Sequence, residues 1–118
     1  MESRLPAKSF KDLLVWQKVH KFVLGAFKYT SSFPREEIYA LTSQYRRASV
    51  SIVANIAEGF KKRGKADKAM YMNIAQGSFE ECRYYLILSR DLNYWPNNEL
   101  TVLINDLVKC WKHIPQQF

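Results

Sequence analysis

The residues best suited to bind a metal ion or act as nucleophiles are few in this sequence, and they form no recognisable site. His20 and His113 lie far apart, with no HExxH or His-x-His pattern and no cysteine at ligand spacing. His20 also lacks an evident partner that would position it as a general base. The four glycines form no phosphate-binding cluster. We therefore predict no metal, no cofactor, no small-molecule substrate and no catalytic residue, so the protein is not expected to be an enzyme.

Glutamates in the middle of the chain raise a second possibility, because inward-facing glutamate pairs hold di-iron centres in helical bundles. That chemistry needs Glu-x-x-His pairs, and the sequence has none. A structural role fits better, in which carboxylates pair with an arginine and hydrogen-bond to an amide and a hydroxyl. We predict a polar layer inside the bundle or at a subunit contact, made of Arg47, Asn55, Glu58, Ser78 and Glu81.

A cluster of cations is the strongest functional signal. One or two of them would complement the carboxyl-terminal end of a helix dipole, and a connection between helices is normally solvated. Five exceed that need, so we predict that the segment contacts nucleic-acid phosphates, with Phe60 or Tyr71 available to stack on a base. A solvated loop is the alternative. The candidate residues, offset by Asp67 alone, are Lys61, Lys62, Arg63, Lys65 and Lys68.

Length and composition indicate one folded domain over residues 1–118. The chain has 47% hydrophobic and 14% aromatic residues in 118, which is enough apolar surface to form a core and too little chain for a second one. Loosely ordered ends are expected at about residues 1–8 and 115–118. A formal charge of +7 favours a polyanionic partner, but it also serves solubility.

The sequence carries no signal peptide and no stretch long and apolar enough to cross a membrane, so no membrane partner is expected. Two cysteines, Cys82 and Cys110, do not make a secreted disulfide framework. Both observations favour a cytoplasmic protein.

Apolar residues recur at steps of three and four in four stretches, which predicts amphipathic helices over about 8–29, 34–63, 66–92 and 98–114. Pro34 suits the first turn of the second helix, and Gly64 suits the position just beyond its end. No stretch alternates with the period of a strand. Because short connections make successive helices run in opposite directions, we predict an all-α, antiparallel up-down-up-down four-helix bundle.

Two further patterns concern how the predicted helices pack. Small residues on the second and third helices would let these two helices approach closely; they are Ala48, Ser49, Ser51, Ala54, Ala57, Gly59, Ala75, Gly77 and Ser78. Apolar residues lie around much of the first and third helices, which predicts self-association because soluble monomers seldom expose large apolar patches. The apolar residues in question are Leu14, Val15, Phe22, Leu24, Met72, Phe79, Tyr84 and Leu88.

An ordered set of motifs spread from Phe10 to about Tyr94 resembles the bacterial four-helix-bundle proteins encoded within intervening sequences of 23S ribosomal RNA genes. Asn-Ile-Ala-Glu-Gly, at residues 55–59, is the most specific of these motifs. The others are Phe10-Lys-Asp-Leu13, Val15-Trp16-Gln17, Phe33-Pro34 with Glu37, Gln44-Tyr-Arg46-Arg47-Ala48, Ser51-Ile52, and Ile74-Ala75-Gln-Gly77-Ser78 with Glu81. The sequence departs from the family pattern at Gly64, where a serine is usual, and at Lys68, where an aromatic residue is usual.

The resemblance implies a bundle without catalytic activity that assembles into a ring-like homo-oligomer, with a pentamer the favoured form. More distantly, the chain is similar to the accessory protein of diversity-generating retroelements, a basic pentameric bundle that works with nucleic acid. Two functions remain open: a nucleic-acid-binding assembly with RNA or DNA as partner, or a protein-interaction scaffold without a nucleic-acid role. The dependence of binding on salt would distinguish them.

Overall fold

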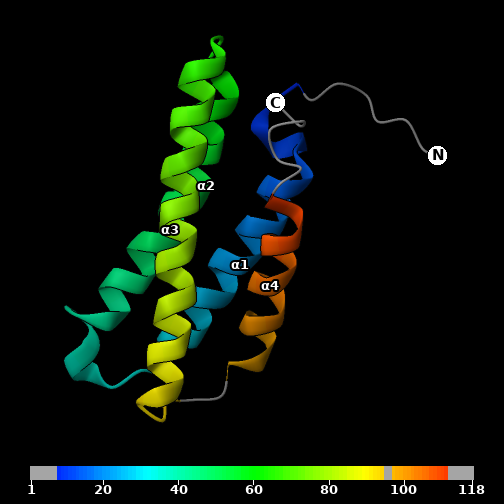
Figure 1. The fold of residues 1–118 in the computed structure, drawn as a ribbon. Helices are drawn as coiled ribbons and strands as arrows, with labels where there is room; N and C mark the ends of the chain where they lie inside the picture. Colours follow the sequence, from blue (N-terminus) through cyan, green and yellow to red (C-terminus); the bar gives the residue numbers. More distant parts are fainter. Residues whose placement is uncertain (1–7, 95–96, 112–118) are drawn as a thin grey trace.

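The computed structural model describes residues 8–94 and 97–111, and within these residues every regular element is a helix. The four α-helices are α1 (Leu14–Thr30), α2 (Leu41–Lys61), α3 (Lys65–Asp91) and α4 (Asn98–Trp111) (Figure 1). Two 3₁₀ turns, Phe10–Asp12 and Arg35–Glu37, precede α1 and α2. The all-α fold class with four helices is confirmed. None of the described helices is long and apolar enough to cross a bilayer.

Successive helices run in alternating directions, as Figure 1 shows. Helices α2 and α3 form a long hairpin whose tip extends beyond the ends of α1 and α4. Contacts between helices agree with this arrangement. Arg47 and Ser51 of α2 contact Glu81 and Ser78 of α3, so a step forward along α2 is a step backward along α3.

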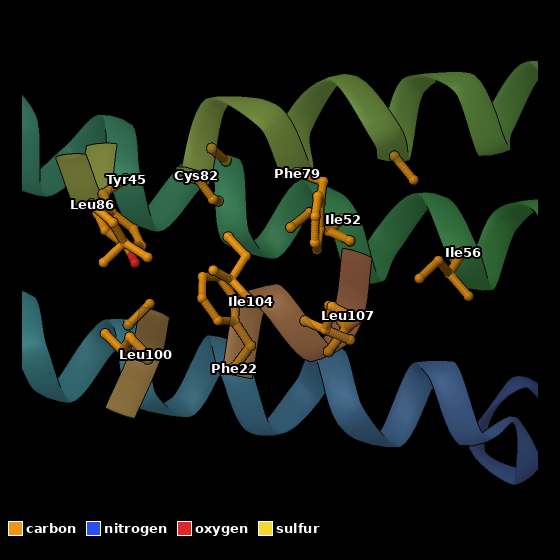
Figure 2. Close-up of a cluster of buried hydrophobic side chains, with 14 of the residues drawn as sticks. Phe22, Tyr45, Ile52, Ile56, Phe79, Cys82, Leu86, Leu100, Ile104 and Leu107 are labelled. Carbon is orange, nitrogen blue, oxygen red and sulfur yellow. The ribbon is translucent and has the colours of Figure 1, made fainter. Parts of the chain in front are cut away.

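The core lies between the α2–α3 pair and the α1–α4 pair (Figure 2). Each helix contributes fully buried side chains at helical spacing, among them Phe22, Ile52, Phe79 and Leu107. Burial of one such side chain contributes about 1.5–3 kcal/mol to folding. Apolar periodicity therefore identifies the four helices, but on α1 and α3 it does not by itself identify the side that faces this core.

Small residues take part in the contact between α2 and α3 at some of the predicted positions, whereas others, such as Ala54, are exposed. Ala48 and Ala75 are buried, and the Ser78 hydroxyl donates to the Ser51 hydroxyl over 2.8 Å. Gly77 is also an exception, because it is exposed and an added Cβ atom would have no side chain or neighbouring helix within 4 Å among the described residues. Close packing inside this chain therefore does not explain Gly77.

The amino-terminal helix boundaries differ from the prediction. The chain from Lys8 forms a bend and a 3₁₀ turn, stabilised by the Ser9–Asp12 capping box, and Leu13 is extended before α1 begins. The second helix does not begin at Pro34. Ile38 and Tyr39, which follow the 3₁₀ turn after Pro34, are exposed and add no apolar side chain to the core.

The connection between α2 and α3 also differs from the prediction. Helix α2 ends at Lys61, and Lys62 is extended. Gly64 is the N-cap residue of α3 with a φ of −83°, so it does not adopt the left-handed conformation expected of a residue beyond a helix end. The residue with that conformation is Asn93, with a φ of 61° just after α3. Asparagine tolerates it better than most residues.

Helix α3 ends at Asp91, within one residue of the prediction, and α4 begins at Asn98 as expected. The predicted end of the fourth helix near Ile114 and the chain termini at residues 1–7 and 112–118 lie outside the described residues.

The predicted surplus of apolar surface is smaller than the sequence indicates. Val15, Phe22, Met72 and Phe79 belong to the core, because the stripes that face it are wide. The remaining positions of that set do face solvent at least in part: Leu14, Leu24 and Tyr84 are exposed and Leu88 is half-buried.

Tyr45 provides a test of core packing. Its side chain is fully buried, and its hydroxyl has no hydrogen-bond partner among the described residues. Burial raises its pKa far above the usual value. Since an unpaired buried hydroxyl costs about 1–3 kcal/mol, we expect Tyr45→Phe to raise the free energy of unfolding by about 1 kcal/mol, measured by urea denaturation. Tyr85→Phe, which removes a donor to Glu81, is the control and should not stabilise; a destabilised Tyr45→Phe would contradict the assignment.

Tyr94 provides a second test, through pH. Its hydroxyl donates to Glu37 Oε2 over 2.6 Å, and this bond, with burial and the nearby carboxylates, raises the pKa of Tyr94 to about 12. The neutral phenol is thus the form favoured by folding, so the bond stabilises the protein below the ordinary tyrosine pKa of about 10 and is lost as pH rises towards 12. We expect the stability advantage of the parent over Tyr94→Phe to shrink across this window in urea titrations. An advantage independent of pH would contradict the bond.

Candidate nucleic-acid interface

The predicted basic segment forms the tip of the α2–α3 hairpin. It comprises the last residue of α2, the three-residue connection and the first turn of α3. Lys61, Arg63 and Lys65 are exposed there. Because the tip extends beyond the other two helices (Figure 1), these three side chains are accessible to a large partner. We call Lys61, Arg63 and Lys65 the tip cations.

Lys62 differs from the tip cations. It is half-buried, and its ammonium nitrogen lies 5.2 Å from the centroid of the Tyr71 ring, which is a cation–π distance. The charge of Lys62 therefore stabilises the junction of α2 with α3.

Lys68 has a structural role that the sequence analysis did not identify. Its ammonium group donates to the backbone oxygens of Phe60 at 2.9 Å and Gly59 at 3.3 Å, and it lies 5.8 Å from the centroid of the Phe60 ring. It thus gives the Phe60 carbonyl a charged donor at the end of α2 and adds a second donor to the Gly59 carbonyl, which also accepts from the Lys62 N–H. The signal available in the sequence was a lysine at the end of the first turn after a helix-breaking connection.

The Lys62 and Lys68 contacts also change the expectation of base stacking. Phe60 and Tyr71 are half-buried, and one face of each ring is within cation–π range of a lysine of the same chain. The tip therefore offers charge to a partner, with little free aromatic surface.

The amino-terminal end of α3 adds positive potential at the same place. Gly64 provides no side chain to cap this 27-residue helix, so its first backbone N–H groups face solvent next to the tip cations. Asp67, in the first turn, offsets part of this potential. Three exposed cations and one exposed carboxylate leave a tip that attracts anions.

The five residues of the predicted polar layer form two groups and one isolated residue, and the charged members lie at the surface. Arg47 and Glu81 make an ion pair of 3.4 Å with side chains 61% and 44% exposed. Such exposed pairs contribute little to stability, about 0–1 kcal/mol. This pair therefore does not lie within the bundle, because the two side chains meet on the solvent side of α2 and α3; its alternative place, at a subunit contact, stays a prediction.

The neutral members of the predicted layer are better buried. Ser78 is buried and bonds to Ser51, whose hydroxyl and backbone oxygen both accept from the Asn55 amide at 3.1 and 2.8 Å. Glu58 is exposed and makes no ion pair within the described part of the chain. The buried polar side-chain contact between α2 and α3 is thus the hydroxyl pair of Ser51 and Ser78, and the Asn55 amide holds Ser51 in place from within α2.

Among the described residues, the histidine and cysteine side chains do not lie together in a catalytic or metal-binding site. His20 is exposed and stacks on Trp16 at a centroid distance of 5.0 Å. Burial, with a smaller effect of the Glu81 charge, raises the pKa of the Cys82 thiol to about 12, so this cysteine is protonated at neutral pH. Among the described residues, no three histidine, cysteine or acidic side chains lie close enough to share a metal ion.

Comparison with known proteins gives a family and a fold. A family model described as 23S rRNA-intervening sequence protein matches residues 11–115. The crystal structure of a protein of unknown function from the S23 ribosomal protein family of Bacteroides thetaiotaomicron is similar, with a TM-score of 0.72 at 24% sequence identity; the match covers 86% of this chain and 91% of that one. No curated protein sequence matches the chain.

Two substitutions distinguish the hydrogen bonds that Lys68 makes from the effect of removing a positive charge. We expect Lys68→Met to lower the free energy of unfolding by about 1–2 kcal/mol, because backbone oxygens at the end of α2 lose their charged donor. Lys65→Met removes the same charge from an exposed position and should change stability by less than about 0.5 kcal/mol. Both are measured by urea denaturation, and equal effects of the two substitutions would contradict the capping role.

Proposed function

The chain belongs to the 23S rRNA-intervening sequence protein family, and from this premise we propose that it is a non-enzymatic, self-associating bundle that binds RNA or DNA through phosphate contacts at the hairpin tip. The observation that carries the proposal is the position of the tip cations. Lys61, Arg63 and Lys65 are exposed together at the end of a projecting hairpin, whereas Lys62 and Lys68 contact their own chain.

The shape of the tip supports phosphate contacts more than recognition of base sequence. Lysine and arginine side chains on a helix end and a short connection provide charge and N–H donors. The two aromatic rings near the tip are half-buried against lysines. Binding is therefore expected to depend on the number of phosphates and on salt, with little dependence on sequence.

Self-association would raise the affinity for nucleic acid even though each hairpin tip binds weakly. Three charges give a modest contact, but a ring that displays several tips binds a long polyanion with much higher avidity. A pentamer is the form that the family resemblance favours. The free, buried thiol of Cys82 suits the reducing cytoplasm, which is where we place this activity.

Exposed apolar side chains support a second function, a protein-interaction scaffold. Leu24 on α1 and Tyr84 on α3 are both more than half exposed. A partner protein bound through such residues would be held mainly by apolar contacts, which are far less sensitive to salt than phosphate contacts are.

Removing the tip cations tests the nucleic-acid function. We expect the triple substitution Lys61→Gln, Arg63→Gln and Lys65→Gln to weaken binding to single-stranded RNA and duplex DNA alike. The slope of log K against log salt should flatten by about 0.7 on single strands, or 0.9 on duplex DNA, for each phosphate that the variant no longer neutralises. Fluorescence anisotropy over a salt series measures both the affinity and the slope.

The control variant, Lys11→Gln, Arg35→Gln and Lys109→Gln, removes the same charge from exposed positions that do not belong to the tip. It should keep most of the parent's affinity. If both variants weaken binding equally, net charge and not the tip governs affinity. If the parent protein binds neither polymer at low salt, the scaffold function is favoured.

A further inference from the structure

Helix α3 carries two apolar stripes, and the core uses only one. The buried stripe runs through Met72, Ala75, Phe79, Cys82, Leu86 and Ser89. A second series repeats in alternating steps of four and three residues, which is the spacing of a helix that packs against another helix. We call it the outer seam, and it consists of Met70, Ile74, Gly77, Glu81, Tyr84 and Leu88.

The outer seam has no covering element among the described residues of this chain. Ile74 is 45% exposed and Tyr84 is 56% exposed, although both sit on a long helix whose opposite side is in the core. Arg47 of α2 reaches Glu81 of the seam, so the α2 residues on the same side as Arg47 border it. Among these, Val50 and Ala54 are exposed and extend the apolar surface.

Gly77 lies in the middle of the outer seam. A glycine inside an exposed helix costs about 1 kcal/mol relative to alanine, and here no close contact within the described chain requires it. A missing side chain is useful where a second helix must approach the backbone closely. Gly77 therefore marks the point of closest approach of whatever covers the seam.

The net charge beside the outer seam is slightly negative, although the net charge of the whole chain is +7. The charged side chains there are three glutamates, Glu58, Glu80 and Glu81, and two arginines, Arg47 and Arg83. The arginines make the ion pairs Arg47–Glu81 and Arg83–Glu80. Glu58 has no ion-pair partner among the described residues. A partner for this surface should combine apolar side chains with unpaired cations.

The outward side of α1 has this composition. Leu14 and Leu24 are exposed, and Lys21 and Lys28 lie on the same side at helical spacing. Helix α1 contains no acidic residue. Glu99 and Asp106 of α4 line the groove next to these lysines, but no ion pair joins them in the described residues.

We propose that the outer seam is covered by the outward side of α1 from a second copy of this chain, an inference that rests on the proposed self-association. The outer seam and the outward side of α1 are different surfaces, so the contact is head-to-tail. Each copy binds one neighbour through its outer seam and another through its α1. A head-to-tail contact closes into a ring when its rotation allows. Opposite charges beside two apolar stripes set the orientation and disfavour contact of like surfaces.

Charge reversal tests the contact. One variant carries Lys21→Glu and Lys28→Glu, and the other carries Glu58→Lys and Glu80→Lys. Each alone should associate at least about tenfold more weakly than the parent in sedimentation equilibrium, because like charges then face each other. Mixed in equal amounts they should form complexes, since the altered surface of one variant now matches the altered surface of the other. Failure of the mixture to associate would overturn the proposal.

A pair of arginine substitutions gives a test that does not depend on reversed charges. Gly77→Arg should stabilise the helix of each subunit while its side chain blocks close approach, so association falls although folding is retained by circular dichroism. Gln76→Arg adds the same side chain on the adjacent, exposed side of α3 and should associate like the parent.

The two proposals fail in different ways. A parent that sediments as a monomer at micromolar concentration contradicts self-association itself. A parent that associates, together with a Gly77→Arg variant that associates equally well, leaves self-association intact and overturns the outer seam as its contact.

Discussion

The close pairing of α2 with α3 is the contact on which the rest of the structure depends. Ser51 of α2 and Ser78 of α3 meet hydroxyl to hydroxyl at 2.8 Å, and the Tyr45 and Tyr85 rings of the two helices lie 6.0 Å apart between centroids. Helices that approach so closely hold their large apolar residues on one common side, where Ile52 and Phe79 complete a core with Phe22 and Leu107 (Figure 2). Helix α1 packs mainly on α2, and α4 packs mainly on α1, where an added Cβ atom at Gly25 would lie only 2.7 Å from Leu100.

Each connection is secured in the same way, by a donor from the next helix that reaches back to carbonyl groups of the previous one. Arg46 of α2 donates to the Thr30 hydroxyl and the Phe27 carbonyl near the end of α1. Lys68 of α3 does so at the end of α2, and the Asn97 amide, just before α4, donates to the Leu86 carbonyl in α3. Helix ends leave several carbonyls without partners, and burying them unpaired would be costly. The Phe27 and Gly59 carbonyls also accept from the backbone N–H groups of Ser31 and Lys62, so the side-chain contacts add donors near the helix ends and tie each helix to the next.

Helical periodicity predicted the four helices and the all-α class because apolar residues recur at helical spacing in each of them. It did not identify the core-facing side of α1 and α3, where Phe22 and Phe79 were predicted as surplus apolar surface and are buried. Boundaries failed where a distant contact decides them: the turn after Pro34 is held by Tyr94, which lies 57 residues from Glu37 in sequence. The same limit applies to the candidate site. Five cations look equivalent in sequence, yet Lys68 caps α2 and Lys62 lies over Tyr71, whereas three remain exposed. Which cation is used internally depends on the angle of the hairpin, and no local pattern records that angle.

The hairpin keeps the two proposed activities apart in space. The outer seam occupies the shaft of α3 from Met70 to Leu88, and the tip cations lie beyond the seam's amino-terminal end. A neighbour packed along the shaft would leave the tip in solvent, because the tip already extends past the ends of α1 and α4 (Figure 1). Mutual repulsion among the tip cations is then screened by water and salt, and the contacts along the shaft are left undisturbed. Head-to-tail assembly would repeat the tip at regular intervals, which is the arrangement that turns three weak phosphate contacts per subunit into avid binding of a polyanion.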